Sequence, residues 1–211
     1  MMIGRTRMNR RAAAVAVVVA LTGGLTMAVE TGAPKLAKAT FAGGCFWCTE
    51  AVYEQIKGVK GVTSGYLGGS VPDPTYKDIC TGLTGHAEAV EIEYDPALVP
   101  YEKLLEVFFA THDPTTKNRQ GVDVGTQYRS GVFYHDDEQK RIAEDVIARL
   151  DASRAFPAKI VSEVTKASKF YPAEDYHQEY FANNPEQDYC RAIVAPKVDK
   201  VRKVFREMLK E

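Results

Sequence analysis

The order of strand-like and helix-like segments constrains the fold of this chain more than any other feature of the sequence. Apolar and acidic side chains alternate over residues 87–94, which is typical of a half-buried strand. In residues 101–109 the apolar side chains fall at i, i+3, i+4, i+7 and i+8, which predicts a helix that buries one face. By the same criteria, strands are predicted over residues 38–41, 59–66, 130–134 and 160–164, and helices over residues 45–56 and 136–150.

Six of these segments follow one another as strand, helix, strand, strand, helix, strand. That order is typical of a split β-α-β arrangement. The sequence therefore predicts an α+β domain built as a two-layer plait with a split β-α-β core. Residues 67–85 are rich in glycine and proline and are expected to form a functional connection without regular structure. The amphipathic residues 197–209 are expected to dock on the domain as a further helix.

The charge balance excludes one large class of partner. Lys and Arg total 27 and Asp and Glu total 28, so the formal net charge is −1. A nucleic-acid-binding surface needs an excess of positive charge to neutralise phosphates, so we expect no nucleic-acid partner. The four cysteines are too few for a domain held together by disulfides, so the position of each one has to explain it.

The first residues of the chain have the features of a targeting segment. Four arginines precede an apolar run over residues 12–21, and residues 26–28 end it with small side chains. This predicts a signal peptide over residues 1–28, with a retained N-terminal anchor as the alternative. A linker is predicted over residues 29–37 and a single domain over residues 38–211. We therefore expect an exported protein, located in the periplasm.

The candidate nucleophile lies where a strand gives way to a helix. Gly43 and Gly44 precede Cys45, Phe46 and Trp47, and a second cysteine follows at Cys48. The amides and dipole of a first helical turn favour a thiolate, so the pKa of the Cys45 thiol is expected to be lowered. The two adjacent aromatic side chains suggest an apolar substrate pocket, although core packing would explain them equally well.

Other interpretations of these cysteines are available. A buried structural cysteine is the commonest fate of a free thiol. A zinc site lacks the second cysteine pair that such sites use, so no metal is expected. A Cys-x-x-Cys redox centre fits the helix start, but Phe-Trp between the sulfurs is unlike the thioredoxin type. In the remaining interpretation, Cys45 attacks a substrate and another cysteine resolves the product.

The chain resembles the A class of peptide methionine sulfoxide reductases. The resemblance extends from about residue 39 to residue 205 and depends on an ordered set of motifs, which is far more specific than any one of them. These motifs are Gly44-Cys45-Phe46-Trp47, Gly65-Tyr66, Gly68-Gly69, Pro74-Thr75-Tyr76, Gly85-His86-Ala87-Glu88, His112-Asp113-Pro114, residues 123–130 and Glu174-Asp175-Tyr176-His177-Gln178.

The resemblance implies a fold, a substrate class and a set of roles. The fold would be an α+β plait related to the ferredoxin-like fold, and the substrate would be the S epimer of methionine sulfoxide, free or in oxidised proteins under repair. Cys45 would attack sulfur, and a protonated Glu88 would supply a proton to the oxygen. By the same resemblance, the substrate-binding residues would be Phe46 and Trp47 for the methyl group, Tyr76 and Tyr128 as hydroxyl donors, and Asp123 as a supporting hydrogen-bond partner.

Oxygen transfer would leave a sulfenic acid on Cys45, which a second thiol must resolve. Cys190 matches the resolving position near the C-terminus of many relatives. It is favoured here, and it is expected to reach Cys45 on a mobile tail. Cys48 replaces the commoner glycine and could form the disulfide locally or pass it outward. Cys80 is expected to be structural, as are the four histidines, His86, His112, His135 and His177.

The remaining expectations concern partners and alternatives. A thioredoxin-like electron donor would recycle the disulfide, and the protein is expected to be a monomer with neither a metal nor an organic cofactor. One alternative function is an exported thiol-disulfide oxidoreductase that uses Cys45 and Cys48. A non-enzymatic alternative is a secreted binding domain in which Cys45 forms a structural disulfide with Cys48 or Cys190.

Overall fold

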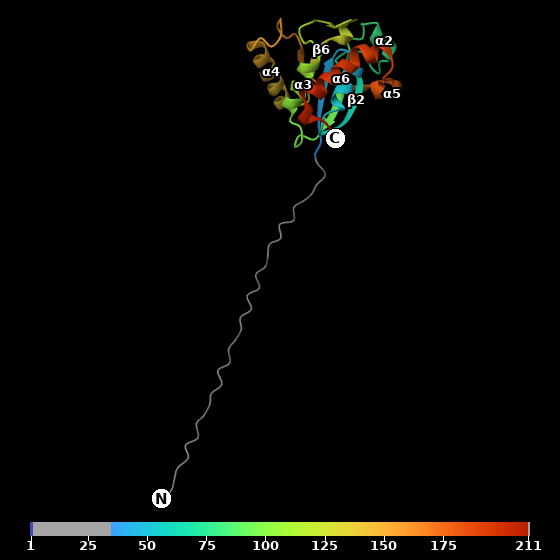
Figure 1. Ribbon diagram of the computed structural model, residues 1–211. Helices are drawn as coiled ribbons and strands as arrows, with labels where there is room; N and C mark the ends of the chain where they lie inside the picture. The colour runs from blue at the N-terminus through green and yellow to red at the C-terminus, as the bar shows by residue number, and fades with distance from the viewer. Residues whose placement is uncertain (2–34, 211) are drawn as a thin grey trace. The chain divides into compact units, whose positions relative to one another are not determined.

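The computed structural model describes Met1 and residues 35–210 (Figure 1). The signal peptide predicted over residues 1–28 and most of the predicted linker lie outside the described residues. The sheet strands are β1 (Ala37–Gly43), β2 (Val59–Leu67), β3 (Ala87–Tyr94), β6 (Ser130–Tyr134), β7 (Glu163–Lys166) and β8 (Tyr171–Pro172). The short strands β4 (Arg119–Gln120) and β5 (Asp123–Val124) pair with each other. The α-helices are α1 (Phe46–Tyr53), α2 (Tyr76–Cys80), α3 (Tyr101–Thr111), α4 (Asp137–Ala152), α5 (Tyr180–Asn183) and α6 (Ala195–Val204).

One mixed sheet organises the domain, in the order β7-β6-β1-β3-β2-β8. All neighbouring pairs are antiparallel except β6 and β7, which run parallel. Helix α4 packs near the β6–β7 side and α5 lies toward the β2–β8 side, so the two helices occupy opposite sides of the domain in Figure 1. The domain is therefore a mixed α/β fold with a central, mostly antiparallel sheet.

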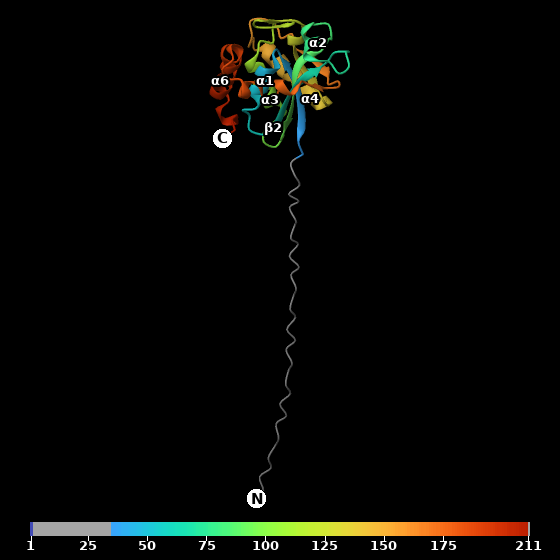
Figure 2. The same ribbon diagram turned by 90° about the vertical axis from the view of Figure 1, so that its right-hand side faces the viewer.

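The main core lies on one face of this sheet. Apolar side chains from α1, α3, α4 and α6 pack there against the central strands. Phe41 of β1 stacks on Tyr53 of α1 and Phe108 of α3, with ring centroids 5.6 and 5.0 Å apart. A smaller apolar cluster lies at strand positions that alternate with those of the main core, and it includes Leu67 and Phe133. In the view of Figure 2, α6 lies on the opposite side of the domain from α2.

Most predicted elements are present with small shifts in their ends. The strand predicted over residues 87–94 has those limits in the structure, although its first four residues are all buried and only Glu91 and Glu93 are partly or fully exposed. The strand predicted over residues 160–164 is displaced to Glu163–Lys166. Among the described residues, no helix combines the length and apolar character needed to cross a membrane.

Two departures from the sequence-based expectations bear on the site. The 67–85 connection contains α2, a five-residue helix that begins with a capping box between Thr75 and Asp78. The C-terminal helix begins before residue 195, because a π-helical turn over Cys190–Val194 leads directly into α6. Pro196 lacks the N–H that an α-helix needs, so the wider turn just before it has a physical cause. Cys190 is therefore buried in a helix instead of lying on a mobile tail.

Candidate active site

The backbone at the end of β1 places Cys45 at the start of α1. Gly44 has φ +89°, and a Cβ atom at this position would lie 2.5 Å from the Cβ atom of Gln120. Only glycine adopts this positive φ without strain and also avoids the contact with Gln120, so any other residue would have to move the neighbouring loop. Cys45 follows as the N-cap residue of α1, and its side chain makes no capping hydrogen bond. The thiol is thus held at the end of a sheet strand, next to the first amides of a helix.

A cavity of about 170 Å³ lies beside this thiol. Its lining includes every residue that the sequence predicted as catalytic or substrate-binding, although those residues come from distant parts of the chain. One lining residue, Tyr189, was not predicted. The lining residues are Cys45, Phe46, Trp47, Tyr76, Glu88, Asp123, Tyr128 and Tyr189.

The thiol of Cys45 has the opposite pKa shift from the one expected. Burial raises its pKa well above the ordinary value, and the neighbouring Cys48 and Glu88 raise it further. The side chain is only 6% exposed, so the loss of hydration outweighs the stabilising effect of the helix start. Cys45 therefore rests as a neutral thiol, and it must lose its proton during the reaction.

Glu88 is the second residue of β3 and pairs with Tyr66 of β2. Burial raises the pKa of its carboxyl to about 8, although the backbone N–H of Phe46 donates to its Oε2 atom at 3.1 Å. The carboxyl is therefore protonated over most of the neutral range. This agrees with the expectation of a carboxyl that is held ready to donate a proton.

Tyr76 and Tyr128 bring two hydroxyl groups to the same cavity. Burial is the largest cause that raises the pKa of both hydroxyls, and the charge of Glu88 raises both further. Both groups therefore keep their protons and can donate hydrogen bonds. The Glu174 carboxylate positions the first of them, because it accepts the backbone N–H of Tyr76 and the hydroxyl of Tyr66, each at 2.9 Å.

Trp47 is held in place by two residues that the sequence analysis did not assign to the site. Its indole N–H donates to Nδ1 of His177 at 3.1 Å. Its ring stacks on Tyr180, with ring centroids 3.6 Å apart and an interplanar angle of 5°. His177 therefore has a structural role, and the structure that it supports is the Trp47 wall of the cavity. Neither contact has a local sequence signal, because 130 residues separate Trp47 from His177.

Tyr189 connects the cavity to the cysteine cluster. Its hydroxyl donates to Oδ2 of Asp123 at 2.6 Å and lies within hydrogen-bonding reach of both Cys45 and Cys48. Its ring meets Trp47 edge-on, with ring centroids 5.9 Å apart. Asp123 therefore accepts a hydrogen bond from Tyr189, and its expected part in substrate binding stays a prediction. The signal for Tyr189 was its place beside Cys190 in the sequence.

Three of the four thiols form a buried series. Cys48 lies one helical turn after Cys45, and its backbone N–H donates to the carbonyl of Cys45 at 3.1 Å. A hydrogen bond with the Cys45 sulfur lowers the pKa of Cys48, and the Lys197 ammonium lowers it further. Burial raises the pKa of Cys190, and so does the charge of Cys48. Cys48 therefore interacts with both other thiols, whereas Cys80 is exposed.

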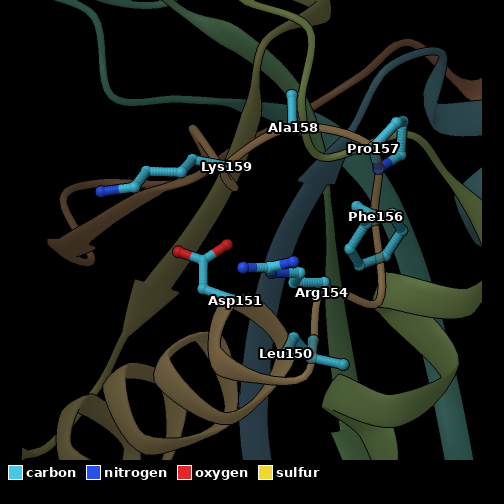
Figure 3. Close-up of a pocket in the computed structure, with 7 residues that line it drawn as sticks. All are labelled: Leu150, Asp151, Arg154, Phe156, Pro157, Ala158 and Lys159. Carbon is cyan, nitrogen blue, oxygen red and sulfur yellow. The ribbon is translucent and has the colours of Figure 1, made fainter.

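The domain surface has other hollows that contain none of the predicted residues. One of them is a hollow of about 360 Å³ at the end of α4 (Figure 3). Figure 3 shows Leu150 and Asp151 on the last turn of α4 and residues 156–159 on the loop that follows. The Asp151 carboxylate in this hollow accepts a hydrogen bond from the backbone N–H of Ile160 at 3.0 Å. Within residues 35–210, no cluster of His, Cys, Asp and Glu has the arrangement of a metal site.

Comparison with known proteins identifies close relatives over most of the chain. The profile of the family described as peptide methionine sulfoxide reductase matches residues 37–209. A protein from Polynucleobacter asymbioticus named peptide methionine sulfoxide reductase MsrA is 53% identical over 176 residues, which is 83% of this chain and 93% of that protein. The MsrA of Chromobacterium violaceum is 55% identical over 172 residues, which is 82% of this chain and 98% of that protein.

Solved structures give the same result at greater evolutionary distance. The reduced form of Mxr1 from Saccharomyces cerevisiae has a TM-score of 0.67 and 35% identity, covering 74% of this chain and 90% of that one. Methionine sulfoxide reductase A of Corynebacterium diphtheriae has a TM-score of 0.64 and 35% identity, covering 74% of this chain and 78% of that one. The sequence match and the shared fold lead to one conclusion: this chain belongs to the peptide methionine sulfoxide reductase family.

Proposed function

We propose that the protein reduces the S epimer of methionine sulfoxide, free or in oxidised proteins, and that Cys45 and Glu88 carry the reaction. One observation supports this most strongly. A single cavity brings together a nucleophilic sulfur, a carboxyl protonated at neutral pH and two tyrosine hydroxyls. A sulfoxide needs this combination, because its sulfur must be attacked while its oxygen gains protons before it can leave.

The roles follow from where each group lies. The methyl group of the substrate fits between Phe46 and Trp47. The sulfoxide oxygen accepts hydrogen bonds from Tyr76, Tyr128 and the Glu88 carboxyl. The Cys45 sulfur bonds to the sulfoxide sulfur, its thiol proton is lost, and the oxygen is protonated. The oxygen then moves to the Cys45 sulfur while its bond to the substrate sulfur and the bond between the two sulfurs both break. This gives a Cys45 sulfenic acid and methionine, so the thiol is oxidised by two electrons and the sulfoxide is reduced by two.

Cys48 is the thiol best placed to resolve the sulfenic acid. Its sulfur already interacts with that of Cys45, and the Lys197 ammonium favours its thiolate. Attack by Cys48 on Cys45 forms a disulfide and releases the oxygen as water. Cys190, which the sequence favoured, faces Cys48 and is buried in its helix, so it would act second by exchanging with the Cys45–Cys48 bond.

Disulfide mapping tests this order. One equivalent of S-sulfoxide peptide without reductant is expected to join Cys45 to Cys48, and Cys190→Ser is expected to give the same product. Cys48→Ser should slow loss of the sulfenic acid by roughly tenfold or more, because the helical turn that holds Cys190 must rearrange before it can reach Cys45. Cys80→Ser removes the exposed fourth thiol and is expected to give the same Cys45–Cys48 product. A Cys45–Cys190 bond with Cys48 unmodified would contradict the proposed order.

A thioredoxin-like dithiol is the proposed electron donor. It would reduce the final disulfide by exchange, so that its own two thiols become a disulfide. The alternative function, exported thiol-disulfide exchange through Cys45 and Cys48, predicts activity on a reduced and scrambled protein when no sulfoxide is present. Family membership favours the reductase over this exchanger.

The activity itself is tested with the two epimers of a sulfoxide peptide. Purified protein with dithiothreitol is expected to consume the S epimer and leave the R epimer. Consumption of neither epimer, or of the R epimer alone, would overturn the proposed function.

The finer architecture and the cellular setting are part of the proposal. The β6-β1-β3-β2 order with antiparallel neighbours supports a split β-α-β plait of the ferredoxin-like kind. The remaining strands, β7 and β8, would then be edge additions to that core. The arginines and apolar run of residues 1–28 support export to the periplasm, either with cleavage of this segment or with its retention as an anchor. The rest of the chain would then form a single domain that acts as a monomer.

A further inference from the structure

The thiol proton of Cys45 must leave the sulfur during oxygen transfer, and a nearby group has to accept it. The Cys45 side chain is only 6% exposed, so bulk water has little access to the thiol. Burial also raises the pKa of this thiol, so the proton is still present when the substrate binds. Glu88 is protonated over most of the neutral range and gives its proton to the sulfoxide oxygen, so its carboxyl is not the acceptor. Another side chain of the cavity has to fill this role.

The hydroxyl of Tyr189 lies between the thiol and a carboxylate. Tyr189 lines the cavity together with Cys45 and Asp123. Its hydroxyl donates to Oδ2 of Asp123 at 2.6 Å, which is the length of a charge-assisted hydrogen bond, and it lies within hydrogen-bonding reach of the Cys45 sulfur. A phenolic oxygen accepts as well as donates, so the hydroxyl that donates to Asp123 can accept the Cys45 thiol proton.

We propose that Tyr189 relays the Cys45 proton to Asp123 while Cys45 attacks the sulfoxide sulfur, an inference that rests on the proposed function. The thiol proton moves to the Tyr189 oxygen as the hydroxyl proton moves to the Asp123 carboxylate. Tyr189 thus gains one proton and loses one, and it never becomes a tyrosinate. This suits its surroundings, because burial and the nearby Cys45 raise the pKa of the Tyr189 hydroxyl and disfavour its charged form.

The relay acts during the attack and not before it. As the Cys45 sulfur shares an electron pair with the sulfoxide sulfur, its S–H bond becomes more acidic, and a base within hydrogen-bonding reach can then take the proton. Protons balance over the cycle: Glu88 gives one to the oxygen and Asp123 gains one from the thiol. Both carboxyls line the same cavity, and the charge of Asp123 already acts on Glu88. Return of the proton from Asp123 to Glu88 restores the resting site.

Cys48 is the other group near the Cys45 thiol that could accept its proton, because the two sulfurs interact. A proton placed on Cys48 would neutralise the thiolate just before it has to attack the sulfenic acid. The Asp123 carboxylate has no such later task, and its bond to Tyr189 is already formed in the resting site. These observations favour the relay, and the experiment separates the two acceptors.

The experiment measures a single turnover with the protein in large excess over an S-sulfoxide peptide and no reductant. Tyr189→Phe keeps the ring that meets Trp47 edge-on and removes the hydroxyl. Asp123→Asn keeps an acceptor for the Tyr189 hydroxyl but cannot take up a proton. Each variant is expected to slow methionine formation at saturation by roughly a hundredfold. The protein concentration that gives half-saturation should stay within about twofold, because the relay acts on chemistry and not on binding.

The double variant Tyr189→Phe/Asp123→Asn separates a relay from two independent contributions. Both substitutions interrupt one proton path, so the double variant should be within about threefold of the slower single variant. Independent effects would multiply to a loss of roughly ten-thousandfold. Tyr101→Phe is the matched control, because it removes a buried hydroxyl that has no hydrogen-bond partner among the described residues and lies outside the cavity. It should change neither the rate nor the half-saturation.

Four results would overturn the relay. They are an unchanged rate in Tyr189→Phe, losses that multiply in the double variant, losses confined to half-saturation, and slow methionine formation in Cys48→Ser with a normal rate in Tyr189→Phe. Failure of the proposed function would look different, because the unaltered protein would then form no methionine from the S epimer.

Discussion

Cys45→Ser is expected to lower S-sulfoxide reductase activity by roughly a thousandfold or more while the fold is retained. A serine hydroxyl is too weak a nucleophile to take the sulfoxide oxygen, and it cannot form a sulfenic acid. Stability should hardly fall, because residue 45 is the N-cap of α1 and makes no capping hydrogen bond as cysteine. Serine is a favoured N-cap residue, so the change could add as much as about 1 kcal/mol.

Two measurements check this prediction: steady-state turnover with dithiothreitol, and the free energy of unfolding in urea. The same variant separates the enzyme from a binding domain in which Cys45 forms a structural disulfide. Such a domain would lose several kcal/mol of stability on substitution (on the order of 2–4) and have no activity to lose. Val204→Ser, at an exposed position of α6, is the control and should change neither measurement.

Glu88→Gln is expected to lower the rate of oxygen transfer by roughly 10²–10⁴-fold and to stabilise the protein at the same time. Glutamine keeps the shape and can still accept the N–H of Phe46, but it cannot supply a proton. The unaltered enzyme should lose activity as the pH rises through about 8, because the carboxyl then gives up the proton that it must donate. The variant should lack this step in its pH profile.

The stability change has a definite sign. The pKa of Glu88 is raised by burial from about 4.5 to about 8, so the folded state binds this proton more tightly than the unfolded state does. The contribution of the carboxyl to stability is complete below pH ~4.3 and is lost as the pH rises toward 8. Near pH 7 the glutamine variant should therefore be more stable by about 3 kcal/mol.

Glu50→Gln provides a matched control. Glu50 is also a buried carboxyl, its pKa is raised by burial to about 7, and it does not line the active-site cavity. Its substitution should also stabilise the protein at neutral pH, but activity should remain. Loss of stability in Glu88→Gln, or activity equal to that of the unaltered protein, would contradict the assigned role.

The sequence predicted the strands and the cavity lining well, for different physical reasons. Alternation over residues 87–94 located the strand because its second half buries Ile92 and Tyr94 and leaves Glu93 exposed, and that pattern is visible without a structure. The residues of the cavity come from distant segments, so no local pattern joins them. They were found through ordered motifs shared with a family, and the structure then placed them around one thiol.

Three features were not predictable because they depend on contacts across the fold. Burial reverses the pKa shift expected for Cys45, and sequence alone does not show how deeply a thiol is buried. Tyr189 and Tyr180 reach Trp47 from the C-terminal segment, with no spacing that signals it. The π-helical turn at Cys190 arises where Pro196 interrupts a longer helix, which placed this thiol in a helix and not on a tail.

The central claim is that Cys45 itself takes the oxygen from the sulfoxide. The most direct test uses the Cys48→Ser/Cys190→Ser double variant, in which neither candidate resolving thiol remains. One equivalent of S-sulfoxide peptide without reductant should yield one methionine per protein, with the mass of one oxygen atom added to the peptide that contains Cys45. Methionine formed while Cys45 stays unmodified, or an oxygen found on another residue, would contradict the account.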